Sequence, residues 1–346
     1  MNSVPLRPYE AAQLRDCMAR RLFRRSVATG EITLPAVPGM LDTYVTMCES
    51  IFAALGTPFT AEQCERLSAV IDEQLTAAYE ASPRSSIVIT YGAPVGTILN
   101  YHVRAQWWTL ERAYEDWIGT REPPLFGTEP DARVWALACE ADDPSTHRVL
   151  DVGAGTGRNA LALARHGHPV DAVEMTPKFA NLMRQQAHSE SLDVHVIERD
   201  VFETLAGLRR DYRLIVLSEV VSDFRDTRYL RAVFELATVC LVPGGRLVFN
   251  VFLTRDGYNP DNAARELGQQ VYTSIFTPDE ISAAAADLPV ELVDDQSVYE
   301  YEREHLPLGA WPPTSWYAEW VSGQDLFDVG REDSPVEMRW LVYERK

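Results

Sequence analysis

The sequence has few of the features that mark secreted, zinc-binding or membrane-spanning chains. Its 346 residues include only five cysteines, which are widely spaced and never form a C-x-x-C pair. That pattern argues against a disulfide framework or a metal site, so we expect a reducing, cytoplasmic location. No stretch reaches ~18 apolar residues, and the N-terminus has no long apolar signal core. We therefore expect no membrane partner.

Lysine is almost absent, and positive charge is outnumbered. Lys178 and Lys346 are the only lysines, and the formal net charge is −19 at pH 7. Polyanions repel a chain of this sign, so we expect no nucleic acid partner either. The N-terminal arm is the exception, because six arginines fall between residues 7 and 25. A solvated helix face explains this arm most simply, and docking onto the acidic body is the alternative.

Periodicity divides the chain into two regions at about residue 120. Helical spacing predicts helices near residues 9–27, 41–55 and 60–79, the last with a capping box from Thr60 and Gln63. Residues 86–91 and 99–107 alternate around a turn, which predicts a β-hairpin with one apolar face. We expect residues 1–120 to form a helical layer plus this β-hairpin, acting as a substrate lid or a dimerisation region.

Residues 121–346 alternate between strand and helix patterns. The predicted strands are 148–152, 169–174, 194–198, 213–218, 246–252, 290–299 and 336–344. This pattern predicts an α/β domain with a doubly wound, mostly parallel, seven-stranded sheet. The connection at 300–335 is long and rich in aromatic residues, and connections of that length are often functional lids.

The stretch VLDVGAGTGRNALALA, residues 149–164, places three glycines between a strand and a helix. Glycine lets the backbone turn sharply and lets a ligand approach the main chain, while the helix start offers free N–H groups. The dinucleotide fingerprint G-x-G-x-x-G is broken, because Arg158 stands where the third glycine is needed. Asp151 would also repel a pyrophosphate. These features favour a ligand with an ammonium group and no phosphate.

Further signals follow in order along the chain. Glu174 ends the second strand, where it can accept hydrogen bonds from two ribose hydroxyls. Asp200 and Val201 end the third strand, where an acid and an apolar side chain suit an adenine amino group and its ring. A turn, LVPGG at residues 241–245, precedes the fifth strand.

With these signals in register, residues 148 to about 255 resemble a class I S-adenosylmethionine-dependent methyltransferase. Residues 157–174 are also similar to its tellurite-resistance-type branch. The resemblance implies a Rossmann-like fold, S-adenosyl-L-methionine as cofactor, and in-line methyl transfer to an O, N, S or C atom of a small-molecule acceptor. The cofactor-binding residues that it implies are Asp151, Gly153, Ala154, Gly155, Gly157, Asn159, Glu174, Met175, Asp200, Val201 and Ser218. It does not extend to residues 1–120.

The acceptor side is predicted from position. Glu219 and Asp223 follow the fourth strand and are candidate bases, or anions for a cationic substrate; a cofactor or backbone contact and a helix N-cap are the structural alternatives. His102, on the polar face of the hairpin, is a third candidate base, although a solvent-facing histidine is simpler. Expected substrate contacts are Tyr101, Trp108, Arg255, Trp311, Trp316 and Trp320. For the tryptophans, packing under a loop competes with substrate contact.

Three hypotheses stay open. The first is a methyltransferase whose pocket is closed by residues 1–120 and the 300–335 insert. The second keeps the fold and transfers another group from the cofactor. The third is a non-catalytic, cofactor-binding partner subunit. A homodimer is also considered, and His166 and His168 are expected to be a surface pair without a metal.

Overall fold

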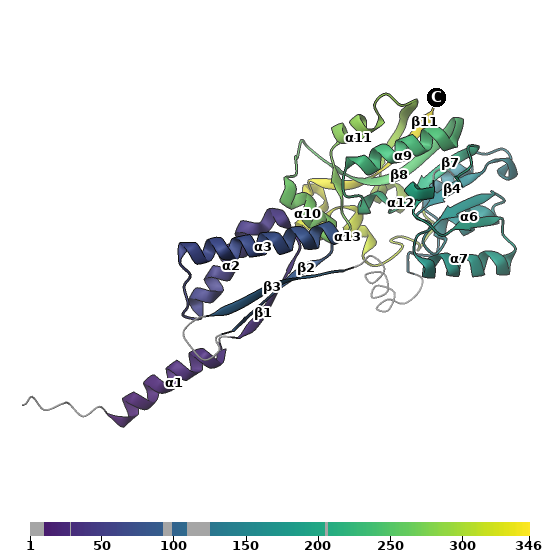
Figure 1. The fold of residues 1–346 in the computed structure, drawn as a ribbon. Helices are drawn as coiled ribbons and strands as arrows, with labels where there is room; N and C mark the ends of the chain where they lie inside the picture. The colour runs from purple at the N-terminus through teal and green to yellow at the C-terminus, as the bar shows by residue number, and fades with distance from the viewer. Residues whose placement is uncertain (1–9, 28, 93–98, 109–124, 205–206) are drawn as a thin grey trace, which may run out of the picture. The chain divides into compact units, whose positions relative to one another are not determined.

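The computed structural model describes residues 10–27, 29–92, 99–108, 125–204 and 207–346 (Figure 1). The chain divides into two compact units, Met1–Leu110 and Glu111–Lys346, which are described separately. The predicted boundary near residue 120 lies outside the described residues. In the described part of the chain, no helix is both long and apolar enough to cross a membrane.

The N-terminal unit contains a three-stranded antiparallel sheet in the order β1-β2-β3. The strands are β1 Gly30–Pro35, β2 Ser86–Gly92 and β3 Asn100–Gln106, and the helices are α1 Ala11–Val27, α2 Leu41–Ala54 and α3 Ala61–Ala81. The β2–β3 pairing confirms the predicted hairpin. Strand β1 was not predicted, because the short run before Pro35 and Pro38 does not alternate clearly.

Helix α3 shows why this unit folds as it does. Its start carries the predicted capping box, in which the Gln63 backbone N–H donates to Thr60 and the Thr60 N–H donates to the Gln63 side chain. Leu67, Ile71 and Leu75 recur at every fourth position and are fully buried. The helix packs against β2 and β3, and alternate residues of β3 face solvent. One helix face therefore covers one sheet face.

The C-terminal unit is built on a sheet in the order β10-β11-β8-β7-β4-β5-β6, with the short strand β9 beside β8. The strands are β4 Val149–Val152, β5 Val170–Val173, β6 Val194–Ile197, β7 Tyr212–Leu217, β8 Leu241–Thr254, β9 Ile275–Phe276, β10 Val290–Ser297 and β11 Val336–Arg345. All neighbours are parallel except that β11 runs antiparallel to β8 and β10. The predicted doubly wound, mostly parallel sheet is confirmed; only β9 was missed.

Helices cover both faces of this sheet. They are α5 Ala132–Ala138, α6 Arg158–Arg165, α7 Pro177–Glu190, α8 Val201–Thr204, α9 Thr227–Cys240, α10 Asn262–Gln270, α11 Pro278–Ala285, α12 Val298–His305, α13 Tyr317–Val321 and α14 Gln324–Phe327. One apolar cluster joins the sheet to α5, α6, α7 and α13, and a second joins it to α9 and α11. Every residue of β4 and β5 is buried, as double coverage requires.

Three histidines meet where β4 and β5 begin. The rings of His147 and His168 lie 5.2 Å apart between centroids, and those of His166 and His168 lie 5.4 Å apart. His168 is fully buried and its Nδ1 bonds the His147 carbonyl, so the expectation of a surface pair was wrong for His168. Burial lowers the pKa of His147 to about 4 and also lowers that of His168.

Candidate active site

The candidate site lies where the strand order reverses. Strand β4 pairs with β5 on one side and with β7 on the other, so successive crossovers leave β4 in opposite directions. Ligands of open α/β sheets bind outside the carboxyl ends of the strands at this switch point. Asp151, the glycine loop, Glu174 and Glu219 all lie at these strand ends.

The glycine loop needs glycine for conformation and for space. Gly153, Gly155 and Gly157 all have positive φ, between 57° and 92°. A Cβ on Gly153 would stand 2.4 Å from Val220 Cγ2, and one on Gly157 would stand 2.8 Å from Leu161 Cγ. Side chains there would strain the backbone and push against packed neighbours. The loop therefore presents bare main chain at the start of α6.

Glu174 links the loop to the end of β5. Its Oε2 accepts from the Gly155 backbone N–H at 2.8 Å, and its Oε1 accepts from the Thr176 N–H at 2.6 Å. The residue is buried, with 6% of its surface exposed. A carboxylate oxygen has two lone pairs, so each oxygen can still accept another hydrogen bond. Glu174 thus fixes the loop and retains acceptor capacity.

Asp200 and Val201 follow β6, as predicted. Asp200 Oδ1 accepts from the Phe202 N–H at 2.8 Å, and Val201 is buried. The other predicted cofactor residues differ in setting. Ala154 and Asn159 are buried, whereas Met175 is 53% exposed.

A buried ion network lies beside the loop. Arg158 donates from Nη1 to Asp131 Oδ1 at 2.6 Å and from Nη2 to Glu219 Oε1 at 2.7 Å. Asp131 Oδ2 also accepts from Ser218 Oγ at 2.6 Å and from Asn159 Nδ2 at 2.8 Å. The side chains of Asp131, Arg158 and Glu219 are 1%, 9% and 15% exposed. One guanidinium therefore holds two carboxylates out of bulk water.

Glu219 is held in an uncommon backbone conformation. Its φ is 60°, in the left-handed region, and its N–H donates to Asn250 Oδ1 at 2.7 Å. A non-glycine residue at positive φ is unfavourable unless its surroundings over-determine it. Burial raises the pKa of the Glu219 carboxyl, and the Arg158 guanidinium opposes that rise. The chain after Glu219 forms the 3-10 turn Val221–Asp223 and not an α-helix.

Asp151 is a buried carboxyl at the end of β4. It is 2% exposed, and burial followed by the charge of Asp131 raises its pKa to about 7, which Arg158 opposes. A buried carboxylate gains most from a cationic partner. The site therefore favours a positively charged ligand group near Asp151.

Buried polar atoms without partners also gather here. Among the described residues, Asp151 Oδ2, Asn250 Nδ2 and the Tyr317 hydroxyl have no hydrogen-bond partner. Burial raises the pKa of Tyr317 well above its usual value, so its hydroxyl stays protonated, and the nearby Asp131, Glu219 and Glu302 act in the same direction. Buried polar groups are normally paired, so a bound ligand is the natural source of the missing partners.

The remaining predicted residues of this unit lie in three places. Asp223 ends the 3-10 turn Val221–Asp223, and Asp226, not Asp223, caps α9. Arg255 donates to the Arg331 carbonyl at 3.3 Å. Trp311 and Trp316 are half-buried and contact the Tyr317 ring, whereas Trp320 is buried against Phe252 and donates to the Tyr272 carbonyl. Core packing therefore accounts for Trp320.

His102, Tyr101 and Trp108 belong to the N-terminal unit. His102 is exposed on β3, and Tyr101 stacks on Phe52 with ring centroids 6.2 Å apart. The Trp108 N–H donates to Ser85 Oγ at 3.3 Å. Their part in an acceptor site stays a prediction.

Sequence reasoning missed Asp131, Arg158 and Tyr317 as site residues. Arg158 was noted only for breaking a glycine pattern, yet an arginine inside an apolar helix start could have signalled a buried ion pair. Asp131 and Tyr317 lie in segments without a motif. Within the described ranges, no three His, Cys, Asp or Glu side chains are placed to hold a metal.

Sequence comparison identifies the region that carries this geometry. Residues 149–245 match the methyltransferase domain family. The ubiquinone biosynthesis O-methyltransferase of Salmonella arizonae is 26% identical over 155 residues, which is 45% of this chain and 59% of that protein. The enzyme of the same name from Erwinia tasmaniensis is 24% identical over 148 residues, covering 43% and 56%. The chain thus spans less than two thirds of these curated relatives.

Solved structures with a similar shape are more distant. A putative sarcosine dimethylglycine methyltransferase from Galdieria sulphuraria has a TM-score of 0.49 at 14% identity, covering 68% of this chain and 97% of that one. Geranyl diphosphate C-methyltransferase from Streptomyces coelicolor A3(2) has a TM-score of 0.47 at 15% identity, covering 62% and 79%. These two likenesses do not bear on activity. The domain match confirms the predicted class: residues 149–245 form a class I S-adenosylmethionine-dependent methyltransferase domain.

Proposed function

We propose that the chain is an enzyme that methylates a small molecule with S-adenosyl-L-methionine. The observation that carries the proposal is the set of strand-end groups at one switch point: the bare glycine loop, the buried Asp151 carboxyl and the half-used acceptors of Glu174. When bound, the cofactor supplies an electrophilic methyl group on a sulfonium, whose leaving group is a neutral thioether.

The residues present fit that cofactor. Asp151 Oδ2 is buried without a partner in the described chain and suits the methionine ammonium group. Glu174 has lone pairs free for two ribose hydroxyls, and Asp200 with Val201 offers an acceptor and an apolar surface for adenine. The loop glycines leave room for close approach to the main chain. These residues would bind and orient the donor, which is the larger part of catalysis when the leaving group is good.

Glu219 is the acceptor-side carboxylate that we favour. It follows β7, faces the same edge as Asp151, and is fixed by Arg158 and Asn250. A fixed carboxylate can orient the nucleophile or take its proton where the acceptor is protonated at neutral pH. Asp223 and His102 remain candidate bases. The 300–335 insert and residues 1–120 are proposed to close over the acceptor and exclude water.

Aromatic side chains support a planar or apolar acceptor. Trp311 and Trp316 are partly exposed around Tyr317, and such rings favour flat, apolar ligands. The curated relatives are named ubiquinone biosynthesis O-methyltransferases, which agrees with an oxygen nucleophile. A cytoplasmic location, the absence of nucleic acid partners, the tellurite-resistance-type branch and the homodimer stay predictions.

Titration calorimetry with S-adenosylmethionine and S-adenosylhomocysteine tests the proposal first. We expect wild type to bind both and Asp151→Ala to lose at least tenfold in affinity. Glu219→Gln should keep cofactor affinity within about threefold and lose turnover in an acceptor panel, because it acts on the acceptor side. The conservative His102→Gln separates the rival base. No cofactor binding by wild type would refute the class.

Two alternatives predict other outcomes. If another group is transferred, mass spectrometry will find methylthioadenosine instead of S-adenosylhomocysteine. If the chain is a non-catalytic partner subunit, tight cofactor binding will persist without turnover across phenols, amines, thiols and carbon acids.

A further inference from the structure

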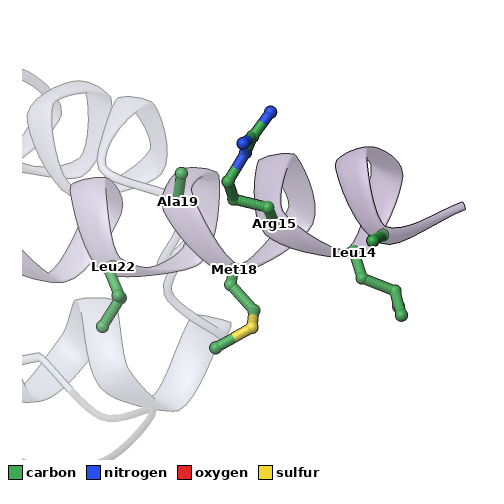
Figure 2. Close-up of a pocket in the computed structure, with 6 residues that line it drawn as sticks. Leu14, Arg15, Met18, Ala19 and Leu22 are labelled. Atoms are coloured by element: carbon green, nitrogen blue, oxygen red, sulfur yellow. The ribbon is translucent and has the colours of Figure 1, made fainter.

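In the described part of the N-terminal unit, no residue covers the apolar side of helix α1. Every described side chain from Ala11 to Leu22 is exposed, including Leu14 at 49%, Met18 at 65% and Leu22 at 59%. Figure 2 shows these three large side chains projecting from one side of the helix, with Arg15 and Ala19 on the other. The helix surface forms a groove of about 430 Å³ lined by Ala11, Leu14, Arg15, Met18, Ala19 and Leu22.

Among the described residues of the N-terminal unit, none buries a side chain of this helix from Ala11 to Leu22. Most helical stability in proteins comes from packing an amphipathic face, and a 17-residue helix is marginal alone. Three large apolar side chains at spacing four are placed as in a packed helix. A partner that covers Leu14, Met18 and Leu22 would supply the missing packing.

The charge of α1 favours an acidic docking surface. Helix α1 carries five arginines and one aspartate, a net charge of +4. Because the whole chain carries −19, the residues outside α1 carry −23. Helix α3 carries five acids and one arginine, a net charge of −4, and its exposed acids are Glu62, Glu65, Asp72, Glu73 and Glu80. The side of α3 away from the sheet is therefore the complement of α1 and also exposes Val70 and Ala69.

The short connection after α1 argues against docking within the same chain. Only residues 28 and 29 separate α1 from β1, which is an edge strand, so the link spans at most ~10 Å. The distance from the sheet to the outer side of α3 is the spacing between sheet and helix plus most of a helix diameter, or roughly 20 Å. The two-residue link alone does not bridge that distance, and α1 is not docked on its own α3 in the structure, because every described side chain from Ala11 to Leu22 is exposed.

We propose that α1 of one copy docks on the acidic outer side of α3 in a second copy, reciprocally, to form a two-fold dimer. A 17-residue helix is ~26 Å long and ~10 Å wide, so two reciprocal contacts bury on the order of 1,000 Å² in total. That area is at the lower end for specific interfaces, and the dimer should form at micromolar concentration and weaken with salt. The proposal is independent of the proposed methyl transfer.

Sedimentation equilibrium of the full chain tests the proposed dimer. The protein concentration runs over about 1–100 µM, which brackets the expected micromolar dissociation constant. We expect wild type to be dimeric at the upper end, and Leu14→Glu with Met18→Glu to raise the dissociation constant at least tenfold. The matched control pair is Met18→Glu alone and Gln13→Glu, each of which adds one negative charge, on opposite sides of α1; Gln13→Glu should change the dissociation constant less than threefold. Thermal unfolding checks the fold, since no described α1 side chain is buried.

A charge exchange identifies the docking surface. Arg15→Glu with Arg21→Glu should weaken the dimer, as should Glu65→Lys with Glu73→Lys, and combining all four should restore much of the affinity. Two results would overturn the proposal. One is a wild type that stays monomeric at about 100 µM, well above the expected dissociation constant. The other is a dimer whose dissociation constant does not change in the Leu14 and Met18 variant. The proposal is also overturned if the variant with all four charge substitutions does not regain dimer affinity, which would indicate pairing of α1 with α1. Binding of a monomer to vesicles of anionic phospholipid would identify a membrane instead.

Discussion

Removing the guanidinium of Arg158 should destabilise the C-terminal unit more than removing a surface arginine. Arg158→Met keeps an unbranched apolar stem but leaves Asp131 and Glu219 without their shared cation. Breaking a buried ion pair from one side costs ~3–5 kcal/mol, because a charge is left in a medium of low polarity. At 1% and 15% exposure, the two carboxylates cannot recover that energy from water.

The matched control is Arg184→Met. Arg184 and Glu198 also pair at 2.6 Å, but with 39% and 36% exposure. Exposed pairs are worth ~0–1 kcal/mol, so this variant should lie close to wild type. Urea denaturation followed by tryptophan fluorescence measures both free energies of unfolding.

The acid dependence separates lost charge pairing from lost packing. Burial raises the pKa of Glu219 and Arg158 opposes that rise, so in Arg158→Met the Glu219 carboxyl should hold its proton in the folded chain at a higher pH than in the unfolded chain. The folded state then binds more protons than the unfolded state. The loss of unfolding free energy in Arg158→Met, relative to wild type, should therefore shrink as the pH falls by about two units, from 7 to 5. Equal losses for both variants, or a deficit independent of pH, would refute the network's assigned role.

Three further predictions follow from the same geometry. Gly153→Ala should lower cofactor affinity at least tenfold in calorimetry, because a Cβ there meets Val220 at 2.4 Å; Gly244→Ala, with a similar positive φ and nothing within 4 Å, should leave affinity unchanged. Cofactor affinity should fall up to tenfold per pH unit below pH 7, since Asp151, with its pKa raised to about 7, must be ionised to pair with an ammonium group, and Asp151→Asn should flatten this profile. The pKa of His147 is lowered to about 4 in the folded chain, so the stabilisation from keeping this histidine neutral is complete above its unfolded pKa near 6.5 and is lost as the pH falls towards 4. His147→Phe removes this titration and should therefore reduce the fall in unfolding free energy between neutral and acid pH by about 1–2 kcal/mol. An unchanged midpoint of acid unfolding would contradict this.

Local sequence was sufficient for most of the fold. The alternation of strand and helix patterns predicted all seven strands on the main path of the large sheet, most clearly for strands such as β7 and β8, which are covered on both faces and mostly apolar. Thr60 and Gln63 predicted a helix start because a capping box is complete within four residues. Strand β1 was missed because a short run before prolines carries no clear period.

The strand-end positions of the proposed cofactor residues were also readable from sequence. Asp151 and Glu174 stand at fixed offsets from strand ends and from the glycine loop, and parallel strands bring their carboxyl ends to one edge. Tertiary structure alone decided the buried ion network on the side where we propose that the acceptor binds. The bonds from Arg158 to Asp131 and to Glu219 join residues 27 and 61 positions apart, and a pairing made by folding across a sheet leaves no periodic signal in the chain.

The same division explains the glycine loop and its neighbours. The sequence by itself determined that a glycine turn, a helix start and Asp151 are adjacent at a strand end, and from that we predict a ligand with a positive group there. Only the tertiary structure decided that Asp151 is fully desolvated, that His168 is buried and that Tyr317 reaches the ion network. Burial depends on what distant segments place around a side chain, and a residue's own neighbours in sequence do not specify it.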